Sequence, residues 1–168
     1  MSNHPEQQEQ RIATVRHPAP NFSANSWYKG SFKQISLKDY QGKWVVLFFW
    51  PLDFTFVCPT EIIAYSNQTK AFGDNLMRSN AHLIGVSVDS VFSHMEWTKK
   101  ARKDGGLGEM EMPMVGDIGG KIARNYGCLI DEGGDAGLAF RATFIIDPKG
   151  IVRHISISDL PVDATLKR

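Results

Sequence analysis

Apolar residues form two uninterrupted or nearly uninterrupted runs in this chain, with a helical pattern between them. Trp44–Trp50 (WVVLFFW) is continuously apolar and is flanked by Gly42 and Pro51, which is typical of a central strand buried on both faces. Ala81–Val88 (AHLIGVSV) is predicted as a second buried strand. From about residue 60 to residue 80, apolar positions recur every three to four residues, which predicts a helix.

The elements after the second strand complete an alternating pattern, and a hairpin is expected before the first strand, within Asn21–Leu37. Ser90 or Asp89 can cap the next helix. The predicted elements are this helix at 91–103, a short strand at 114–115, a short helix at 119–126, a hairpin of strands at 138–147 and 150–158, and a last helix from residue 162. This order predicts a thioredoxin-like α/β fold, with a central mixed sheet flanked by helices and an N-terminal hairpin extension.

Composition supports one globular domain over residues 11–168, preceded by a polar arm at residues 1–10 that is expected to be disordered. Of the 168 residues, 42% are hydrophobic and 22% are charged, and the net charge of +1 argues against nucleic acid or an anionic membrane as a partner. The longest apolar run is far shorter than a membrane-spanning helix.

The two cysteines do not form a disulfide framework, and the chain has no C-x-x-C segment. A dithiol redox motif and a zinc knuckle are therefore not expected. The five histidines also lack the spacing of metal ligands, so we expect no metal site.

Cys58 lies where the first buried strand gives way to the predicted helix, within the segment 51–61 (PLDFTFVCPTE). Pro59 suits the first helical position because it has no N–H group to leave unpaired there. The free N–H groups and the positive dipole of the helix start would favour the nucleophilic thiolate. A free cysteine is more often a packed core residue. Here the helix start, the two prolines, a nearby threonine and two candidate arginines favour a reactive thiol.

Those arginines, Arg141 and Arg153, fall among apolar residues in the two strands of the closing hairpin. Alternation places Arg141 on the same face as Ile145, and Arg153 on the same face as Ile155. An arginine on a buried face is costly unless an anionic group meets it. The alternative to an active-site role is an internal ion pair with Glu61 or with an aspartate.

Several segments in chain order resemble the peroxiredoxins. The spacing Pro51-x-x-x-Thr55-x-x-Cys58 matches the signature of that family, and the string DFTFVCPTE matches its typical 2-Cys branch closely. The resemblance covers nearly the whole chain after the N-terminal arm and also includes APNF at 19–22, SVDS at 87–90, GGLG at 105–108 and FRATFIID at 140–147.

This resemblance implies a thiol-dependent peroxidase that reduces hydrogen peroxide and alkyl hydroperoxides through a cysteine sulfenic acid, and so acts in antioxidant defence. It implies that Cys58 is the peroxidatic cysteine and that Pro51, Thr55 and Arg141 complete the active site. Glu61 and Arg153 match supporting positions. The resemblance implies no haem, flavin or metal cofactor.

The chain departs from the family pattern in its second thiol. The typical branch carries a resolving cysteine in a C-terminal tail, and this sequence has no such residue after the last predicted helix. Either the chain is truncated or the sulfenic acid is resolved differently, and truncation is favoured. Cys128, the second cysteine, is interpreted as a small core residue rather than a resolving thiol.

The resemblance also implies partners. Thioredoxin or a similar dithiol protein would be the reductant, and two chains would form a homodimer through the last strand, with further assembly into decamers. The cytoplasm is the default compartment, with a removed organellar presequence left open. A holdase or a peroxide-responsive signalling protein on the same fold is the alternative function, while a general dithiol exchanger is disfavoured by the missing C-x-x-C.

Overall fold

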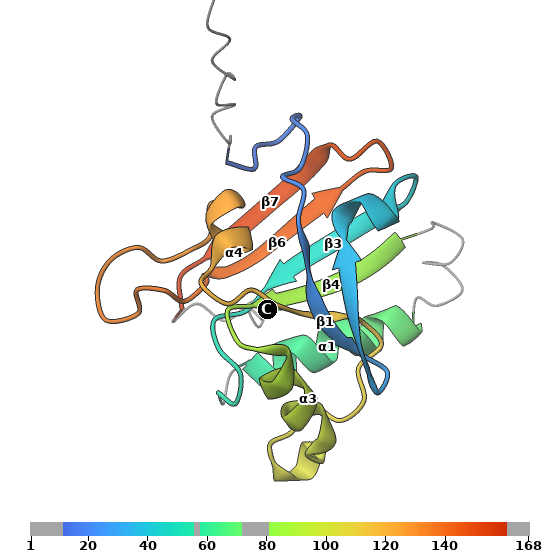
Figure 1. The fold of residues 1–168 in the computed structure, drawn as a ribbon, viewed down its shortest axis with the longest axis vertical. Coiled ribbons are helices and arrows are strands. Elements are labelled where there is room, and N and C mark those ends of the chain that lie inside the picture. Colours follow the sequence, from blue (N-terminus) through green and yellow to red (C-terminus); the bar gives the residue numbers. More distant parts are fainter. Residues whose placement is uncertain (1–11, 56–57, 72–80, 161–168) are drawn as a thin grey trace, which may run out of the picture.

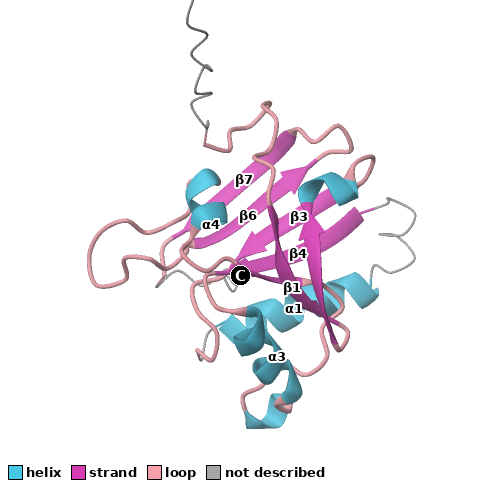
Figure 2. Ribbon diagram, in the orientation of Figure 1, coloured by secondary structure: helices cyan, strands magenta, loops and turns pink. Residues whose placement is uncertain are grey.

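The computed structural model describes residues 12–55, 58–71 and 81–160. Within these ranges seven strands form one mixed sheet in the order β2-β1-β5-β4-β3-β6-β7 (Figures 1 and 2). The strands are β1 (Ser23–Tyr28), β2 (Ser31–Ser36), β3 (Trp44–Phe49), β4 (Ala81–Ser87), β5 (Met114–Gly116), β6 (Arg141–Ile146) and β7 (Val152–Ser158). The helices are α1 (Cys58–Ala71), α3 (Val91–Lys99) and α4 (Lys121–Asn125), with 3-10 turns η1 (Leu37–Tyr40) and η2 (Arg102–Asp104).

The predicted central strand is confirmed, because β3 pairs parallel with β4 on one side and antiparallel with β6 on the other. Both faces of β3 are covered. Val45, Leu47 and Phe49 pack into a core cluster that includes α4, whereas Phe48 and Trp50 pack with residues of α1 and α3. The continuous apolar run thus reflects burial on two faces.

The N-terminal hairpin, the strand at Met114 and the short helix before Gly127 are also found where the sequence predicts them. The arm at 1–10 and the last predicted helix lie outside the described residues. None of the described helices has the length and apolar character needed to cross a membrane.

The helix predicted at 91–103 begins as expected but ends early. Ser90 caps it by accepting a hydrogen bond from the Ser93 N–H group (3.2 Å). The chain turns extended at Lys100, so that Leu107 can fold back beneath the helix and donate its N–H to the carbonyl of Trp97 (3.0 Å). Burial of Leu107, which is 0% exposed, therefore outweighs continuation of the helix to Lys103.

The closing hairpin is confirmed, but the predicted inward position of Arg153 is wrong. A β-bulge between Ile145 and Ile146 shifts the register of β6 against β7. Because a shift of one residue exchanges the two faces of a strand, Val152 becomes fully buried and the Arg153 side chain is 47% exposed.

Candidate active site

The loop 51–55 leaves the carboxyl end of β3 and leads towards α1. Trp50 continues the strand for one more residue by donating its N–H to the carbonyl of Val86 (3.2 Å). Pro51 is buried, and Thr55 is half-buried with its hydroxyl donating to the carbonyl of Leu52 (3.1 Å). Between them Phe54 adopts a left-handed φ of 59°, an unfavourable conformation for a bulky side chain.

The helix predicted to start at Pro59 is found, but it begins one residue earlier. α1 begins at Cys58, so Pro59 is the second helical residue rather than the first. The side chains of Cys58 and Glu61 lie outside what the structure describes. The backbone of Cys58 therefore lies at the end of the helix where free N–H groups and the positive dipole stabilise anions.

Arg141 reaches the same end of the sheet through the pairing of β6 with β3. Ala142 pairs with Phe49, so Arg141 lies beside the point where the chain leaves β3. Arg141 is 9% exposed, and its Nε donates to the carbonyl of Leu160 (3.4 Å).

A contact between α1 and β6 shows which face of the sheet Arg141 occupies. The hydroxyls of Tyr65 in α1 and Thr143 in β6 lie 3.1 Å apart. Thr143 and Arg141 are two residues apart on one strand and therefore share a face, the one that α1 covers. Because α1 and β6 both run back from the carboxyl end of β3, the starts of α1 and β6 lie at the same end of the molecule (Figure 1). Arg141 is the first residue of β6.

Arg153 lies at the opposite end of the hairpin. Arg141 pairs with Ser158, five residues along β7 from Arg153, which corresponds to roughly 16 Å. The Nε of Arg153 donates to Oδ2 of Asp147 at 2.7 Å. The ion pair with an aspartate, which the sequence left open, is therefore the arrangement found for Arg153, and the structure does not bring it to Arg141.

Asp147 organises the turn between β6 and β7. Its Oδ1 accepts the N–H groups of Lys149 (2.9 Å) and Ile151 (3.0 Å). Partial burial acts to raise the pKa of Asp147, but these hydrogen bonds and the Arg153 guanidinium outweigh it and hold that pKa below its usual value.

Cys128 is confirmed as a core residue. It is 0% exposed and packs in the cluster of α4 and β6. Burial raises the pKa of the Cys128 thiol strongly, with a further contribution from the charge of Asp117. A thiol with a raised pKa and no exposure is a poor nucleophile in the folded protein.

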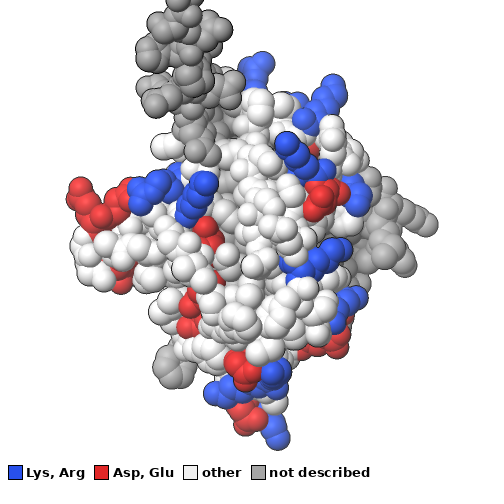
Figure 3. All heavy atoms as spheres, in the orientation of Figure 1, with Lys and Arg blue, Asp and Glu red and all other residues white. Residues whose placement is uncertain are grey.

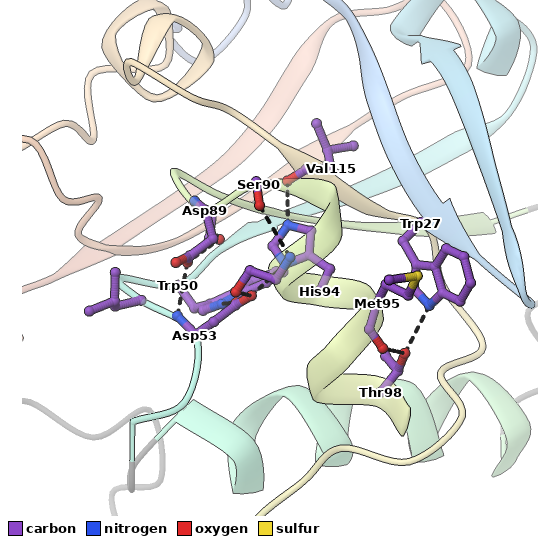
Figure 4. A network of polar contacts seen from close by, with 12 residues as sticks. Trp27, Trp50, Asp53, Asp89, Ser90, His94, Met95, Thr98 and Val115 are labelled. Atoms are coloured by element: carbon purple, nitrogen blue, oxygen red, sulfur yellow. Dashed lines mark hydrogen bonds and ion pairs between the residues drawn. The ribbon is translucent and has the colours of Figure 1, made fainter. Parts of the chain in front are cut away.

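A buried polar network beside the loop was not predicted from the sequence (Figure 4). Asp53 and His94 form its centre, with Nδ1 of His94 2.8 Å from Oδ2 of Asp53. Oδ1 of Asp53 accepts from Nε1 of Trp50 (2.9 Å), and the Asp53 N–H donates to Oδ2 of Asp89 (2.8 Å). Burial, followed by the negative charge of Asp53, raises the pKa of Asp89. The available signals in the sequence were two aspartates, Asp53 and Asp89, that follow the two buried strands.

One face of the molecule is shown with its charged side chains in Figure 3. Positive and negative side chains are interspersed on the face shown in Figure 3, in agreement with the net charge of +1. Among the described residues, no group of three or more His, Cys, Asp and Glu side chains is arranged to hold a metal ion.

Comparison with known proteins finds a family profile and individual relatives that agree with one another. The sequence profile of the AhpC/TSA family matches residues 15–155. Peroxiredoxin-2 of Cricetulus griseus is 49% identical over 150 residues, which cover 89% of this chain and 72% of that protein. The mitochondrial thioredoxin-dependent peroxide reductase of Mus musculus is 48% identical over 155 residues, which cover 92% of this chain and 57% of the relative.

Solved structures agree in fold. The reduced 2-Cys peroxiredoxin of Plasmodium vivax superposes with a TM-score of 0.81 at 37% identity, covering 90% of this chain and 76% of that one. The mitochondrial 2-Cys peroxiredoxin of Plasmodium falciparum gives 0.78 at 39% identity, covering 89% and 86%. The thioredoxin-like fold predicted from the order of elements is thereby confirmed.

Proposed function

The chain belongs to the AhpC/TSA family, and from this premise we propose that Cys58 is the residue that attacks the peroxide. Its relatives are peroxiredoxins and peroxide reductases, and the chain is a thiol-dependent peroxidase. The substrates proposed are hydrogen peroxide and small alkyl hydroperoxides.

In the proposed reaction, the Cys58 thiolate attacks one peroxide oxygen in line with the O–O bond. The S–O bond forms as the O–O bond breaks, and sulfur loses the two electrons that the peroxide gains. The second oxygen leaves as hydroxide or alkoxide and takes a proton from solvent, and Cys58 is left as a sulfenic acid. Catalysis requires stabilisation of the negative charge that grows on the departing oxygen.

Thr55 and Arg141 are the residues proposed to stabilise that charge. The supporting observation is the strand register, which puts Arg141 beside the loop 51–55 and on the face covered by α1. The Arg141 guanidinium would donate hydrogen bonds to the peroxide, and the Thr55 hydroxyl would do so once its proton turns from the carbonyl of Leu52. Buried Pro51 would limit access of water to the sulfur.

Glu61 and Arg153, the two residues expected in supporting positions, are assigned different roles. Glu61 lies one turn into α1 from Cys58 and would orient Arg141, although its side chain lies outside the described part of the chain. Arg153 is engaged with Asp147 at the other end of the sheet, so we assign it a structural ion pair in place of the supporting role expected from the sequence.

Return of Cys58 to its thiol requires two electrons from a dithiol protein. The Mus musculus relative is a thioredoxin-dependent enzyme by name, and thioredoxin is the reductant proposed here. The dithiol becomes a disulfide, and the sulfenic oxygen leaves as water.

The assembly proposed is a homodimer formed through β7, with further assembly into decamers. β7 is the last strand in the sheet order, and Ile157 on it is 44% exposed. An edge strand with an exposed apolar residue is suited to pairing with a second copy. The cytoplasm is the compartment proposed, and the mitochondrial relatives make the mitochondrion the alternative.

A stopped-flow measurement tests the proposed reaction. The reduced protein mixed with one equivalent of hydrogen peroxide should consume it with a rate constant of at least about 10⁴ M⁻¹s⁻¹. Cys58→Ser should abolish this reaction, and Cys128→Ser should leave it intact. A wild-type rate no faster than that of Cys58→Ser would refute the proposal.

A further inference from the structure

We propose that Asp53 is a positioning residue for the peroxide reaction, because its buried carboxylate clamps the loop that carries Pro51 and Thr55. The inference rests on the proposed role of Cys58 and identifies what holds the active-site loop in place. Asp53 is 5% exposed, whereas its neighbours Leu52 and Phe54 are 37% and 51% exposed. Asp53 therefore turns inward between two residues that face solvent.

Three side chains, one from the end of β3 and two from α3, form hydrogen bonds with this one carboxyl group. Oδ1 accepts from Nε1 of Trp50 (2.9 Å) at the end of β3. Oδ2 accepts from the hydroxyl of Ser93 (2.8 Å), on the first turn of α3. Oδ2 also lies 2.8 Å from Nδ1 of His94, on the same turn (Figure 4). A carboxylate that accepts several hydrogen bonds in a buried site has one strongly preferred orientation.

His94 connects the carboxylate to the sheet. Its Nε2 lies 3.0 Å from the carbonyl of Val115 in β5, and a carbonyl can only accept, so Nε2 carries a hydrogen. One further proton is shared between Nδ1 and Oδ2 of Asp53, whichever atom carries it. His94 is 0% exposed and is held on both sides, so its ring fixes the distance between the loop and β5.

The helix α3, which carries two of the three side-chain partners of Asp53, is itself held by hydrogen bonds at both ends. We call the contacts of the Asp53 side chain with Trp50, Ser93 and His94 the clamp. Near the C-terminus of α3, the hydroxyl of Thr98 accepts from Nε1 of Trp27 in β1 (2.8 Å) and donates to the carbonyl of Met95 (2.8 Å). Near its N-terminus it is held by His94. A positioning group is effective only when its own support is ordered.

The backbone of Asp53 is held as well. Its N–H donates to Oδ2 of Asp89 (2.8 Å), which also accepts from the hydroxyl of Ser87 (2.7 Å). The next residue, Phe54, has the left-handed φ of 59°, and Thr55 follows it directly. A strained residue of this kind persists when the surrounding structure holds it. We infer that the contacts of Asp53 maintain the turn that directs Thr55.

The positioning role of Asp53 should affect two reactions of the Cys58 thiol to different extents. Peroxide reduction needs the Thr55 hydroxyl aligned with the departing oxygen, whereas alkylation by iodoacetamide needs only an accessible thiolate. Loss of the clamp should therefore slow the first reaction much more than the second. A residue that supported only folding would change both rates by the same factor.

The test compares Asp53→Ala with Asp53→Asn. Alanine removes every side-chain contact of the clamp. Asparagine can keep them, because its oxygen can accept from Trp50 while its amide donates to Ser93 and to neutral His94. The rate constants of Cys58 with hydrogen peroxide and with iodoacetamide are measured at one pH. Asp53→Ala should lower the peroxide rate about 100-fold and the iodoacetamide rate less than about threefold. Asp53→Asn should stay within about fivefold of wild type in both.

An equal fall in both rates, or an unchanged peroxide rate in folded Asp53→Ala, would overturn the proposal. If Asp53→Ala does not fold by circular dichroism, Ser93→Ala replaces it, since that change removes one donor to Oδ2. Ser93→Ala should lower the ratio of the two rates about fivefold, and an unchanged ratio would overturn the proposal. A slow peroxide reaction in the wild type would instead refute the proposed function of Cys58.

Discussion

Both ends of the central strand β3 are organised by a buried aspartate, Asp53 at the carboxyl end and Asp147 near the amino end. Asp53 is 5% exposed and Asp147 is 7% exposed, and each carboxyl group takes part in three hydrogen bonds. A buried aspartate with three hydrogen bonds is therefore found at both ends of one strand. The reaction that we propose takes place at one of the two ends.

The difference between them lies in where their partners come from. The partners of Asp147 lie within six residues of it, so it closes a local turn. His94 is 41 residues from Asp53, and it ties the loop to another helix and another strand. A loop that must present catalytic groups needs such distant support, because local contacts fix its shape but not its place on the sheet.

The strongest test of this comparison exchanges the two arginines for glutamine. Arg141→Gln should lower the rate of peroxide reduction by about 100-fold or more, because a donor to the departing oxygen is lost. Arg153→Gln should change that rate less than about twofold, because its guanidinium contacts Asp147 at the other end. Stopped-flow kinetics with hydrogen peroxide measures both, and equal effects would remove the distinction between the two ends.

A second test isolates the hydroxyl of Thr55. Thr55→Val keeps the shape of the side chain and removes the donor, and it should lower the peroxide rate about 10- to 100-fold. Thr55→Ser keeps the hydroxyl and should remain within about fivefold of wild type. The two variants are compared in the same kinetic experiment, and a serine variant as slow as the valine variant would argue against hydrogen bonding by Thr55.

A third test examines Asp147, near the amino end of β3, to which we assign a structural role only. Asp147→Asn should reduce the free energy of unfolding at pH 7 by about 1–2 kcal/mol while leaving the peroxide rate unchanged. The pKa of Asp147 is lowered in the folded state, so its stabilising effect is present above the pKa of the unfolded chain. That effect is lost as the pH falls through the lowered folded pKa.

Urea unfolding at several pH values measures this dependence. The difference between wild type and Asp147→Asn should shrink as the solution becomes acidic, since the wild type loses the interaction that the variant lacks. A difference that stayed constant down to about pH 2 would show that the ionised carboxylate does not stabilise the turn.

The smallest effect is expected at Cys128, which belongs to neither end. Burial raises the pKa of its thiol, so its thiolate fraction at any given pH is below that of an ordinary cysteine. Native protein treated with a thiol reagent at pH 8 should label Cys58 quickly and Cys128 only after unfolding. Cys128→Ala should leave the peroxide rate unchanged, and rapid labelling of two thiols in the folded protein would contradict its assignment to the core.

Much of the fold could be predicted because its signals are local. The run at 44–50, the hairpins and the Ser90 cap each depend on neighbouring residues, and the structure confirms them. The two failures arise from contacts made later in the chain. Leu107 folds back and ends α3 early, and the bulge at Ile145 and Ile146 turns Arg153 outward.

In the candidate site as well, local features could be predicted from the sequence and long-range contacts could not. The sequence places Cys58 at a helix start and selects Arg141, and the strand register brings these two positions to one end of the sheet. The link between Asp53 and His94 could not be predicted, because 41 residues separate two side chains that look ordinary in their local context. Long-range polar pairs of this kind become visible only when the fold brings them together.

Oxidation of Cys58, at the start of α1, to a sulfenic acid is the step on which the proposed function depends. Intact-mass analysis and peptide mapping after one equivalent of hydrogen peroxide, with a sulfenic-acid trap present, test it directly. We expect one adduct located at Cys58 in the wild type and in Cys128→Ser, and none in Cys58→Ser. A wild-type protein without an adduct, or with its adduct at Cys128, would show that Cys58 is not the residue that attacks the peroxide.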